Sequence, residues 1–236
     1  MTLDQVLVDE AVRRVRPDFS AVVLLVSGVH NQPTTPESDR WLAEAEAAAR
    51  AAASGGPHPH VRAWQEAYRA FGAKPQRTPS SVDALWQRAV KGGLPRVNWL
   101  VDLYNAVSVM CMLPVGGEDA ARFVGPLRLI RASGQEPFDT IKEGEPFVER
   151  PEPGEVVWAD DAGVTCRRWN WRQGRRTRLT EQSTEVLFLL ERLEPLPLAT
   201  LDEAAAQLAD RLHRRFPDAA IERCTIGAVS AAHEGA

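Results

Sequence analysis

A run of apolar residues between positions 98 and 112 constrains the fold of this chain more than any other feature. Asn98 is a suitable N-cap, the next fourteen positions contain neither glycine nor proline, and Pro114 follows the run. The run therefore predicts a helix over residues 98–112. Because apolar side chains occupy nearly all of its faces, we expect this helix to be buried.

Four polar side chains interrupt the apolar run at spacings of four, three and three residues. At about 100° per residue, these side chains form one narrow stripe along the helix. Such a stripe can face a polar cavity, or it can satisfy caps and the backbone of neighbouring loops. The pattern alone leaves both interpretations open. The stripe consists of Asn98, Asp102, Asn105 and Ser108.

Periodic apolar positions and helix-ending residues predict four further helices. An aromatic stripe at helical spacing ends at Gly72, and Ser80 with Asp83 forms a capping-box-like start for the next helix. Thr200 is the expected N-cap of the last helix. The predicted helices cover residues 38–53, 61–71, 81–91 and 201–216.

Apolar runs of a different period predict the strands. The run over residues 19–29 has an unbroken apolar centre, which is typical of a central strand covered on both faces. Residues 155–159 and 164–172 flank a turn and form a predicted hairpin. Further strands are expected over residues 127–131 and 184–190. These elements predict an α+β fold with a mixed, largely antiparallel sheet covered by helices.

The length of 236 residues and the hydrophobic content of 44% are sufficient for a substantial core. The sequence contains no internal repeat. We therefore predict one domain over residues 1–230 and a loose tail over residues 231–236.

Charge and hydropathy argue against several classes of protein. A net charge of −4 is untypical of a protein that binds nucleic acid through its overall surface charge, so no DNA partner is expected. The apolar run over residues 21–26 is far shorter than a membrane span, and the first residues include acids that a leader peptide lacks. We therefore expect a cytoplasmic protein without a membrane partner.

Neither cysteine nor histidine predicts a metal site, and no cofactor is expected. Cys111, Cys166 and Cys224 are odd in number and far apart, which favours buried or idle thiols over disulfides. His58 and His60 flank a proline, but no carboxylate or cysteine lies at a fitting spacing for zinc. A solvated turn is the preferred interpretation of the two histidines.

The segment from Arg167 to Arg178 is the local exception to the acidic charge, because it holds six arginines and no acid. Arginines beside tryptophans can bind phosphates and stack on the bases of a single-stranded RNA end. Alternatively, Trp169 or Trp171 packs in the core and the arginines pair with acids elsewhere. The candidate RNA-binding residues are Arg167, Arg168, Asn170, Arg172, Arg175 and Arg176.

The predicted helix over residues 98–112 and the residues after it resemble a motif of the B3/B4 domain. This is the tRNA-editing domain of the phenylalanyl-tRNA synthetase β subunit. The family pattern is V-D-x-x-N-x-V-x followed, after a short gap, by G-x-P-x-H-A-F-D. The chain keeps the pattern at Val101, Asp102, Asn105, Val107, Pro114 and Asp119. The resemblance covers roughly residues 60–195, and no synthetase motif accompanies it.

The resemblance implies a free-standing editing protein whose partners are the tRNA acceptor end and an aminoacyl ester. Such a protein hydrolyses the ester of a mischarged tRNA with a positioned water and without a covalent nucleophile. The implied catalytic residues are Asn105, Asp102, Gly116 and Glu118. The implied substrate-binding residues are Asn98, Ser108, Gly117, Thr184 and Glu191. In the family, a glutamate placed like Glu191 reads the phenolic hydroxyl of a misattached tyrosine.

One position departs from the family pattern in the expected pocket. Gly116 stands where the motif has histidine, which removes a polar wall and opens space. Two alternatives to the deacylase therefore remain. The protein is a tRNA or amino-acid binding module without catalysis, or it is a small-molecule hydrolase or ligand sensor on the same fold.

Overall fold

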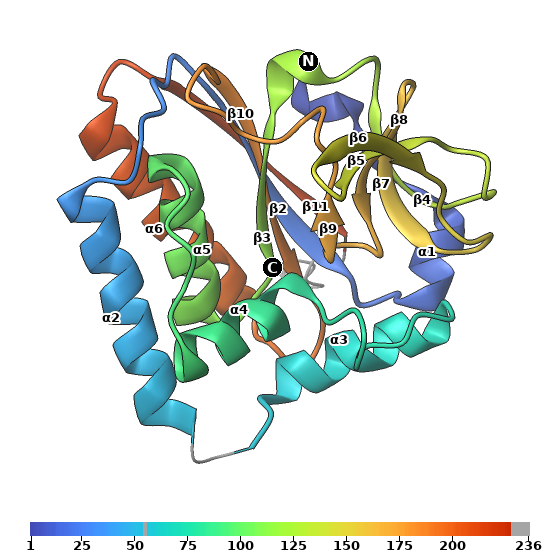
Figure 1. The fold of residues 1–236 in the computed structure, drawn as a ribbon, viewed down its shortest axis with the longest axis horizontal. Helices are drawn as coiled ribbons and strands as arrows, with labels where there is room; N and C mark the ends of the chain where they lie inside the picture. The colour runs from blue at the N-terminus through green and yellow to red at the C-terminus, as the bar shows by residue number, and fades with distance from the viewer. Residues whose placement is uncertain (54–55, 228–236) are drawn as a thin grey trace, which may run out of the picture.

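The computed structural model describes residues 1–53 and 56–227, so the predicted tail lies outside the described residues (Figure 1). The described part contains two sheets and six α-helices, with short 3-10 turns at Leu3–Gln5 and Ala120–Arg122. The helices are α1 (Glu10–Val15), α2 (Pro36–Ala52), α3 (Pro59–Ala70), α4 (Ser81–Lys91), α5 (Trp99–Cys111) and α6 (Leu198–Arg215).

The first sheet has four strands in the order β11-β2-β10-β3, and all of its neighbours are antiparallel. Its central strand β2 is buried along nearly its whole length, which confirms the prediction of a strand covered on both faces. The strands are β2 (Ser20–Ser27), β3 (Val115–Asp119), β10 (Glu185–Arg192) and β11 (Ala220–Gly227).

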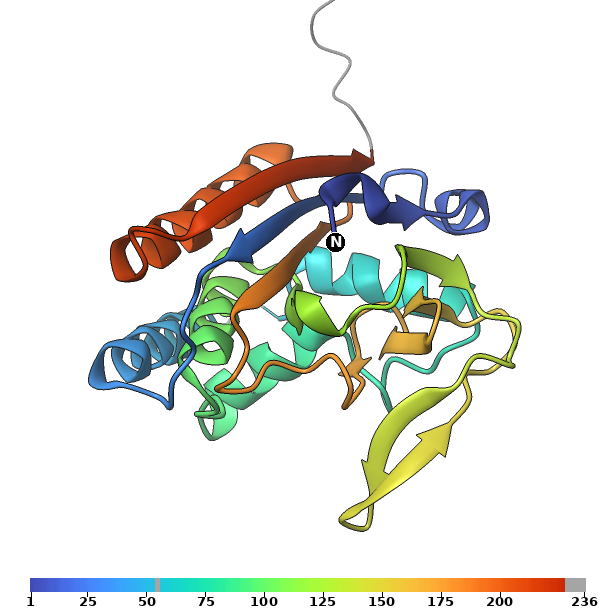
Figure 2. The ribbon, with the colours of Figure 1, turned by 90° about the horizontal axis from the view of Figure 1, so that it is seen from above.

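The second sheet has seven strands in the order β1-β4-β7-β8-β5-β6, with β9 paired to β8. Only the β1–β4 and β5–β8 pairs are parallel. Its outermost hairpin, formed by β5 and β6, projects from the body in Figure 2. The strands are β1 (Val6–Val8), β4 (Leu127–Arg131), β5 (Phe138–Lys142), β6 (Glu145–Glu149), β7 (Val156–Asp160), β8 (Gly163–Arg167) and β9 (Arg172–Gln173).

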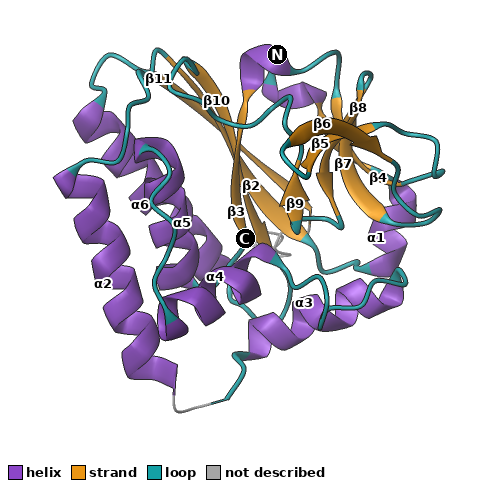
Figure 3. Cartoon of the chain, viewed as in Figure 1, coloured by secondary structure: helices purple, strands orange, loops and turns teal. Residues whose placement is uncertain are grey.

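The α+β class and the largely antiparallel arrangement are confirmed, but the strands are divided between two sheets. Figure 3 shows α2, α5 and α6 on one side of the four-stranded sheet and the seven-stranded sheet on the other. Apolar side chains of α5 and α6 pack on the first side, among them Leu103 and Leu208. Helix α2 packs on α5 through Leu42 and Ala106. Helix α5 is therefore buried over most of its surface, as its sequence predicts, although Met110 near its end is exposed.

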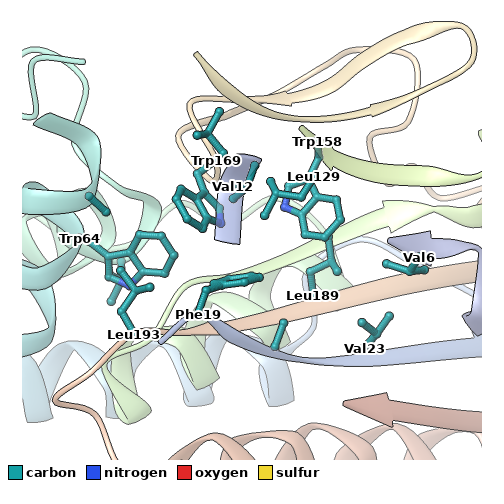
Figure 4. Close-up of a cluster of buried hydrophobic side chains, with 14 of the residues drawn as sticks. Val6, Val12, Phe19, Val23, Trp64, Leu129, Trp158, Trp169, Leu189 and Leu193 are labelled. Carbon is teal, nitrogen blue, oxygen red and sulfur yellow. The ribbon is translucent and has the colours of Figure 1, made fainter. Parts of the chain in front are cut away.

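An aromatic cluster occupies part of the space between the two sheets (Figure 4). The ring of Trp169 lies 5.1 Å from that of Phe19 and 5.3 Å from that of Trp64, both edge to face. Trp158 and Leu189 continue the cluster along the facing strands. This cluster joins α3, the turn after β8 and both sheets into one core.

The N-terminal ends of three helices show which predicted N-cap residues cap their helix. Asn98 caps α5 as predicted, because its Oδ1 accepts from the Val101 amide at 3.0 Å. Ser80 makes no such capping bond. Helix α6 begins three residues earlier than predicted, after Pro197, so Thr200 lies in its first turn and is not the cap.

Two predictions about local conformation are wrong. The predicted strand over residues 164–172 ends at Arg167, because Arg168 and Trp169 adopt left-handed φ angles of 48° and 66°. This turn directs Trp169 into the core. His60 does not lie in a solvated turn but is fully buried in the first turn of α3. Its Nδ1 lies 2.7 Å from the Met112 carbonyl oxygen, and its Nε2 accepts from Trp64 Nε1 and the Leu193 amide, each at 3.1 Å.

None of the helices in the described part of the chain is long and apolar enough to cross a membrane.

Candidate functional site

A cavity of about 280 Å³ lies between the two sheets, next to α4 and α5. Strands β3 and β10 supply one wall, and β7, β8 and the turn after β8 supply the opposite wall. Three tryptophans line it together with aliphatic side chains, so most of its surface is apolar. These tryptophans are Trp158, Trp169 and Trp171.

Two glutamates project into this cavity from the same face of the four-stranded sheet. Glu118 of β3 stands opposite Leu187 of β10, and Glu191 follows four residues later on β10. Glu118 is 3% exposed and Glu191 is 2% exposed. Because side chains alternate along a strand, this register directs both carboxyl groups to the same side of the sheet.

Glu118 is surrounded by hydroxyl groups. Its Oε1 accepts from Thr165 Oγ1 at 3.1 Å, and its Oε2 accepts from Thr177 Oγ1. Burial raises the pKa of Glu118 to about 7, although these two hydrogen bonds and the charge of Arg176 oppose the rise. Threonine hydroxyls can donate or accept, so they tolerate both protonation states of the carboxyl group. Glu118 therefore has the properties of a general base near neutral pH.

Glu191 is held by groups that only donate. Its Oε1 accepts from Trp158 Nε1 at 2.9 Å, and its Oε2 accepts from Asn170 Nδ2 at 2.7 Å. Burial also raises the pKa of Glu191 to about 7, and the charge of Glu118 adds to the rise. The two glutamates thus influence each other across the cavity.

The orientation of Asn170 is determined by its other neighbours. Its Oδ1 accepts from the Tyr68 hydroxyl at 2.9 Å and lies 3.4 Å from the Ser81 amide. An amide N–H can only donate, so the oxygen of Asn170 must face it and the NH₂ group must face Glu191. Asn170, a candidate RNA-binding residue, thus directs its NH₂ group to Glu191 in this structure.

Asn105 is one of the polar groups that line the cavity. It is 6% exposed, and its amide makes no hydrogen bond to any residue within 1–53 or 56–227. Ser81 Oγ and Trp169 Nε1 also make no hydrogen bond of ordinary geometry in the described structure, although a weaker interaction of Trp169 with Glu191 lowers the pKa of that carboxyl group. Buried polar groups are normally paired, so these three mark a place for a ligand or an ordered water.

The other members of the polar stripe on α5 do not line the cavity. Asp102 accepts from Ser38 Oγ at 2.9 Å and from the Val97 amide at 3.0 Å, which joins α2 to α5. Ser108 Oγ donates to the Leu113 carbonyl at 2.7 Å, and Asn98 is the N-cap. The cavity interpretation of the stripe is therefore correct for Asn105 alone, because α2 and the ends of α5 surround the other three.

The two glycines of β3 have different surroundings. Gly116 lines the cavity, and a Cβ there would meet nothing within 4 Å. A Cβ on Gly117 would lie 3.0 Å from Tyr104 Cε1 and 3.1 Å from Phe188 Cε1, so this glycine permits close packing. Its carbonyl accepts from Gln173 Nε2 at 2.8 Å. Gly117 is therefore beside the cavity and not in its wall.

Thr184, a predicted substrate-binding residue, lies outside the site. It is exposed and precedes β10, whereas Glu191 lies near the other end of that strand. The Thr184 carbonyl accepts from the Gly28 and Val29 amides at 3.0 and 3.2 Å. It belongs to the connection between β10 and β2.

The arginines predicted to bind RNA are paired with acids of the seven-stranded sheet. Arg167 is 6% exposed and donates to both oxygens of Glu155, at 2.9 and 2.8 Å. Arg176 donates to both oxygens of Asp160, at 2.9 and 2.6 Å. The remaining pairs are Arg168 with Glu155, Arg172 with Glu149 and Arg175 with Asp139. The alternative in which these arginines neutralise acids is therefore the observed arrangement.

Some residues of the site were not found from the sequence, namely Trp158, the two threonines around Glu118 and Arg88. Trp158 and the threonines around Glu118 lie on predicted strands or loops without a motif, and only their facing positions bring them together. Arg88 is exposed at the cavity on α4 and has no ion pair among the described residues. The Cys166 thiol also lines the cavity, and burial raises its pKa well above the usual value, in agreement with an idle thiol.

Comparisons with known proteins connect this geometry to a family. A solved N-terminal fragment of the phenylalanyl-tRNA synthetase β subunit from Pyrococcus horikoshii matches with 12% identity and a TM-score of 0.46. The match covers 94% of this chain and 54% of the fragment, so the chain spans about half the length of that structure. No curated protein matches. The B3/4 domain family matches residues 63–225, which is more than half of the chain and includes both glutamates and Asn105. This protein belongs to the B3/4 domain family.

Proposed function

We propose that this protein hydrolyses the ester between a wrong amino acid and its tRNA, with the aminoacyl group bound in the cavity between the two sheets. The observation that supports this most directly is that the buried amide of Asn105 and the buried carboxyl of Glu118 line one cavity whose surface is mostly apolar. The volume of about 280 Å³ suits one aminoacyl group. The membership of the B3/4 family supports a substrate related to tRNA.

In the proposed reaction, Glu118 takes a proton from a water molecule while the water oxygen attacks the ester carbonyl carbon. The Asn105 amide donates to the carbonyl oxygen as negative charge develops on it. The bond between the carbonyl carbon and the ribose oxygen then breaks, and the proton moves from Glu118 to that oxygen. An aminoacyl ester is already activated, so no covalent nucleophile is required.

Arg88 is the proposed contact for the RNA, in place of the paired arginines after β8. It lies at the cavity on α4, it is exposed, and no acid within the described chain neutralises it. A phosphate of the acceptor end can therefore approach it at little desolvation cost.

The test is deacylation of a panel of mischarged tRNAs by the purified protein and by an Asn105→Ala variant. Asn98→Ala is the matched control, because Asn98 lies on the same helix outside the cavity. We expect kcat to fall by about 100-fold or more in Asn105→Ala and to stay within about threefold in the control. Full activity of Asn105→Ala, or no turnover of any substrate, would reject the proposal.

A second candidate function is hydrolysis of a small amino-acid ester without RNA, which the neutralised arginines favour. Arg88→Ala separates the two candidates. A tRNA deacylase loses kcat/KM on charged tRNA but keeps it on the corresponding methyl ester. A small-molecule esterase hydrolyses the methyl ester at least as well as the tRNA, with or without Arg88.

A further inference from the structure

We infer that the cavity selects an amino acid whose side chain carries a positive charge, and that Glu191 binds this charge. This inference rests on the proposed function, because it names the class of aminoacyl group that is removed. It covers primary amines and guanidinium groups.

The hydrogen bonds of Glu191 are arranged for a carboxylate. Trp158 Nε1 and Asn170 Nδ2 occupy one oxygen each, and neither group can accept. The Ser81 amide, which can only donate, opposes a turn of the Asn170 oxygen toward Glu191. A protonated Glu191 would have to use another lone pair or lose one of these bonds. These two donors therefore favour the ionised form, against the opposing effect of burial, and leave an acceptor for the cavity.

No cation within the described residues lies within 4 Å of Glu191, although other buried acids of the chain have such partners. The charged or titratable groups that face it are Glu118 across the cavity and the protonated Cys166 and Tyr68. Burial of an unpaired carboxylate is costly, which agrees with the raised pKa of Glu191, about 7. A cationic ligand group would provide the missing partner.

The walls around Glu191 suit a cation as well. The side chains of Trp158, Trp169 and Trp171 line the cavity beside it. Indole rings attract ammonium and guanidinium groups, by about 0.5–2 kcal/mol when the contact is desolvated. Arg168 already lies 4.5 Å from the Trp171 ring, so Trp158 and Trp169 are the indoles that remain for a ligand. A neutral aliphatic side chain would gain from the indoles but would leave Glu191 unpaired.

Glu118 and Glu191 lie far enough apart for one to contact the ester and the other to contact the end of the amino-acid side chain. Four residues of strand β10 separate Glu191 from the position opposite Glu118, which corresponds to roughly 14 Å between their Cα atoms. The ester can therefore lie beside Glu118 and Asn105 while the end of a long side chain reaches Glu191.

The decisive comparison uses tRNA charged with lysine or with Nε-acetyl-lysine, because these substrates share their four-carbon side-chain stem and α-amino group but differ in side-chain charge. The acetyl group also adds length, and a preference caused by that length would persist in Glu191→Gln. Tyrosine-charged tRNA tests the neutral hydroxyl alternative. We expect kcat/KM at pH 8 to favour lysine over Nε-acetyl-lysine by at least about 10-fold. In Glu191→Gln, we expect this ratio to fall to about 1, with an unchanged far-UV spectrum showing that the variant is folded.

Binding of lysinamide and norleucinamide, measured by calorimetry, separates this inference from the proposed function. Lysinamide binding that tightens from pH 6 to pH 8 and depends on Glu191 supports the inference even if no ester is hydrolysed. Equal or better hydrolysis of neutral aminoacyl esters overturns the inference and leaves the proposed function standing. Absence of both hydrolysis and lysinamide binding overturns both.

Discussion

Glu118 and Glu191 show how two residues of one type acquire different chemistry in one cavity. Both are almost fully buried, and burial raises the pKa of each to about 7. The partners of Glu118 are hydroxyl groups that accept either protonation state, whereas those of Glu191 only donate. In the proposed function this difference fits proton transfer by Glu118 and recognition of a cationic side chain by Glu191.

Replacing Glu118 by glutamine should raise stability at alkaline pH. The pKa of Glu118 is higher in the folded chain, about 7, than in the unfolded chain, so its contribution to stability is full below pH 4.5 and is lost as pH rises through 7. The variant avoids this loss. We therefore expect the variant to gain stability relative to the parent as the pH rises. The difference in free energy of unfolding, variant minus parent, should be up to about 3 kcal/mol larger at pH 8 than at pH 5.

Urea unfolding at the two pH values measures this difference. The same variant should lose deacylation by about 100-fold or more, because glutamine cannot take the proton. A pH-independent difference in stability would show that Glu118 is ionised in the folded protein throughout this range.

Two adjacent glycines of β3 provide a matched pair of substitutions. Gly116→Ala places a methyl group in open space, so we expect a change in stability within about 0.5 kcal/mol. Gly117→Ala forces a methyl group against Tyr104 and Phe188, and should cost about 1–3 kcal/mol. Thermal melting of both variants checks the prediction. Equal destabilisation by the two would contradict the assigned positions.

At the scale of elements, the segment that ends β8 stabilises the seven-stranded sheet through ion pairs. Arg167 joins β8 to Glu155, before β7, and to Glu149 of β6. Both Arg167 and Glu155 are buried. The high arginine content of this segment therefore has a structural explanation.

Arg167→Ala should cost about 3 kcal/mol, because it leaves Glu155 buried and only partly compensated by Arg168 at 3.5 Å. Arg175→Ala is the control, since Arg175 and Asp139 form a more exposed pair worth about 0–1 kcal/mol. Denaturant unfolding gives both values. Binding of uncharged tRNA should be unchanged in Arg175→Ala, and a loss of affinity there would restore the RNA-binding interpretation of this segment.

At the scale of the molecule, His60 connects three parts of the chain that are far apart in sequence. It bonds within α3 to Trp64, to Met112 at the end of α5, and to Leu193 after β10. Its Nε2 accepts two hydrogen bonds, so the ring is neutral with its proton on Nδ1. Burial lowers the pKa of His60 to about 4.

This junction should make the fold sensitive to acid. The contribution of His60 is fully present above pH 6.5 and is lost as pH falls toward 4, because the unfolded chain binds the proton more tightly. His60→Gln keeps an amide donor and acceptor but cannot titrate. We therefore expect its melting temperature to fall less than that of the parent between pH 6.5 and pH 4.5. An equal fall in both proteins would mean that other groups cause the acid sensitivity.

The sequence by itself determined the features that depend on short-range periodicity. Helices α3, α4 and α5 appear near their predicted limits, and β2 is buried on both faces, because 3.6-residue and continuous apolar patterns are readable within one segment. The motif resemblance also selected Asn105, Gly116, Glu118 and Glu191, which all line the cavity. Strand β3 was missed because its two glycines and two acids lack an apolar pattern.

Only the tertiary structure decided which polar residues form the site. The pairing of β3 with β10 places Glu118 and Glu191 on one face, and a shift of one residue in either strand would turn its glutamate away. Asp102 and Asn105 lie three residues apart on one helix, yet α2 covers the first and the cavity receives the second. Such contacts join segments distant in the chain, and their energy depends on packing that no single segment contains.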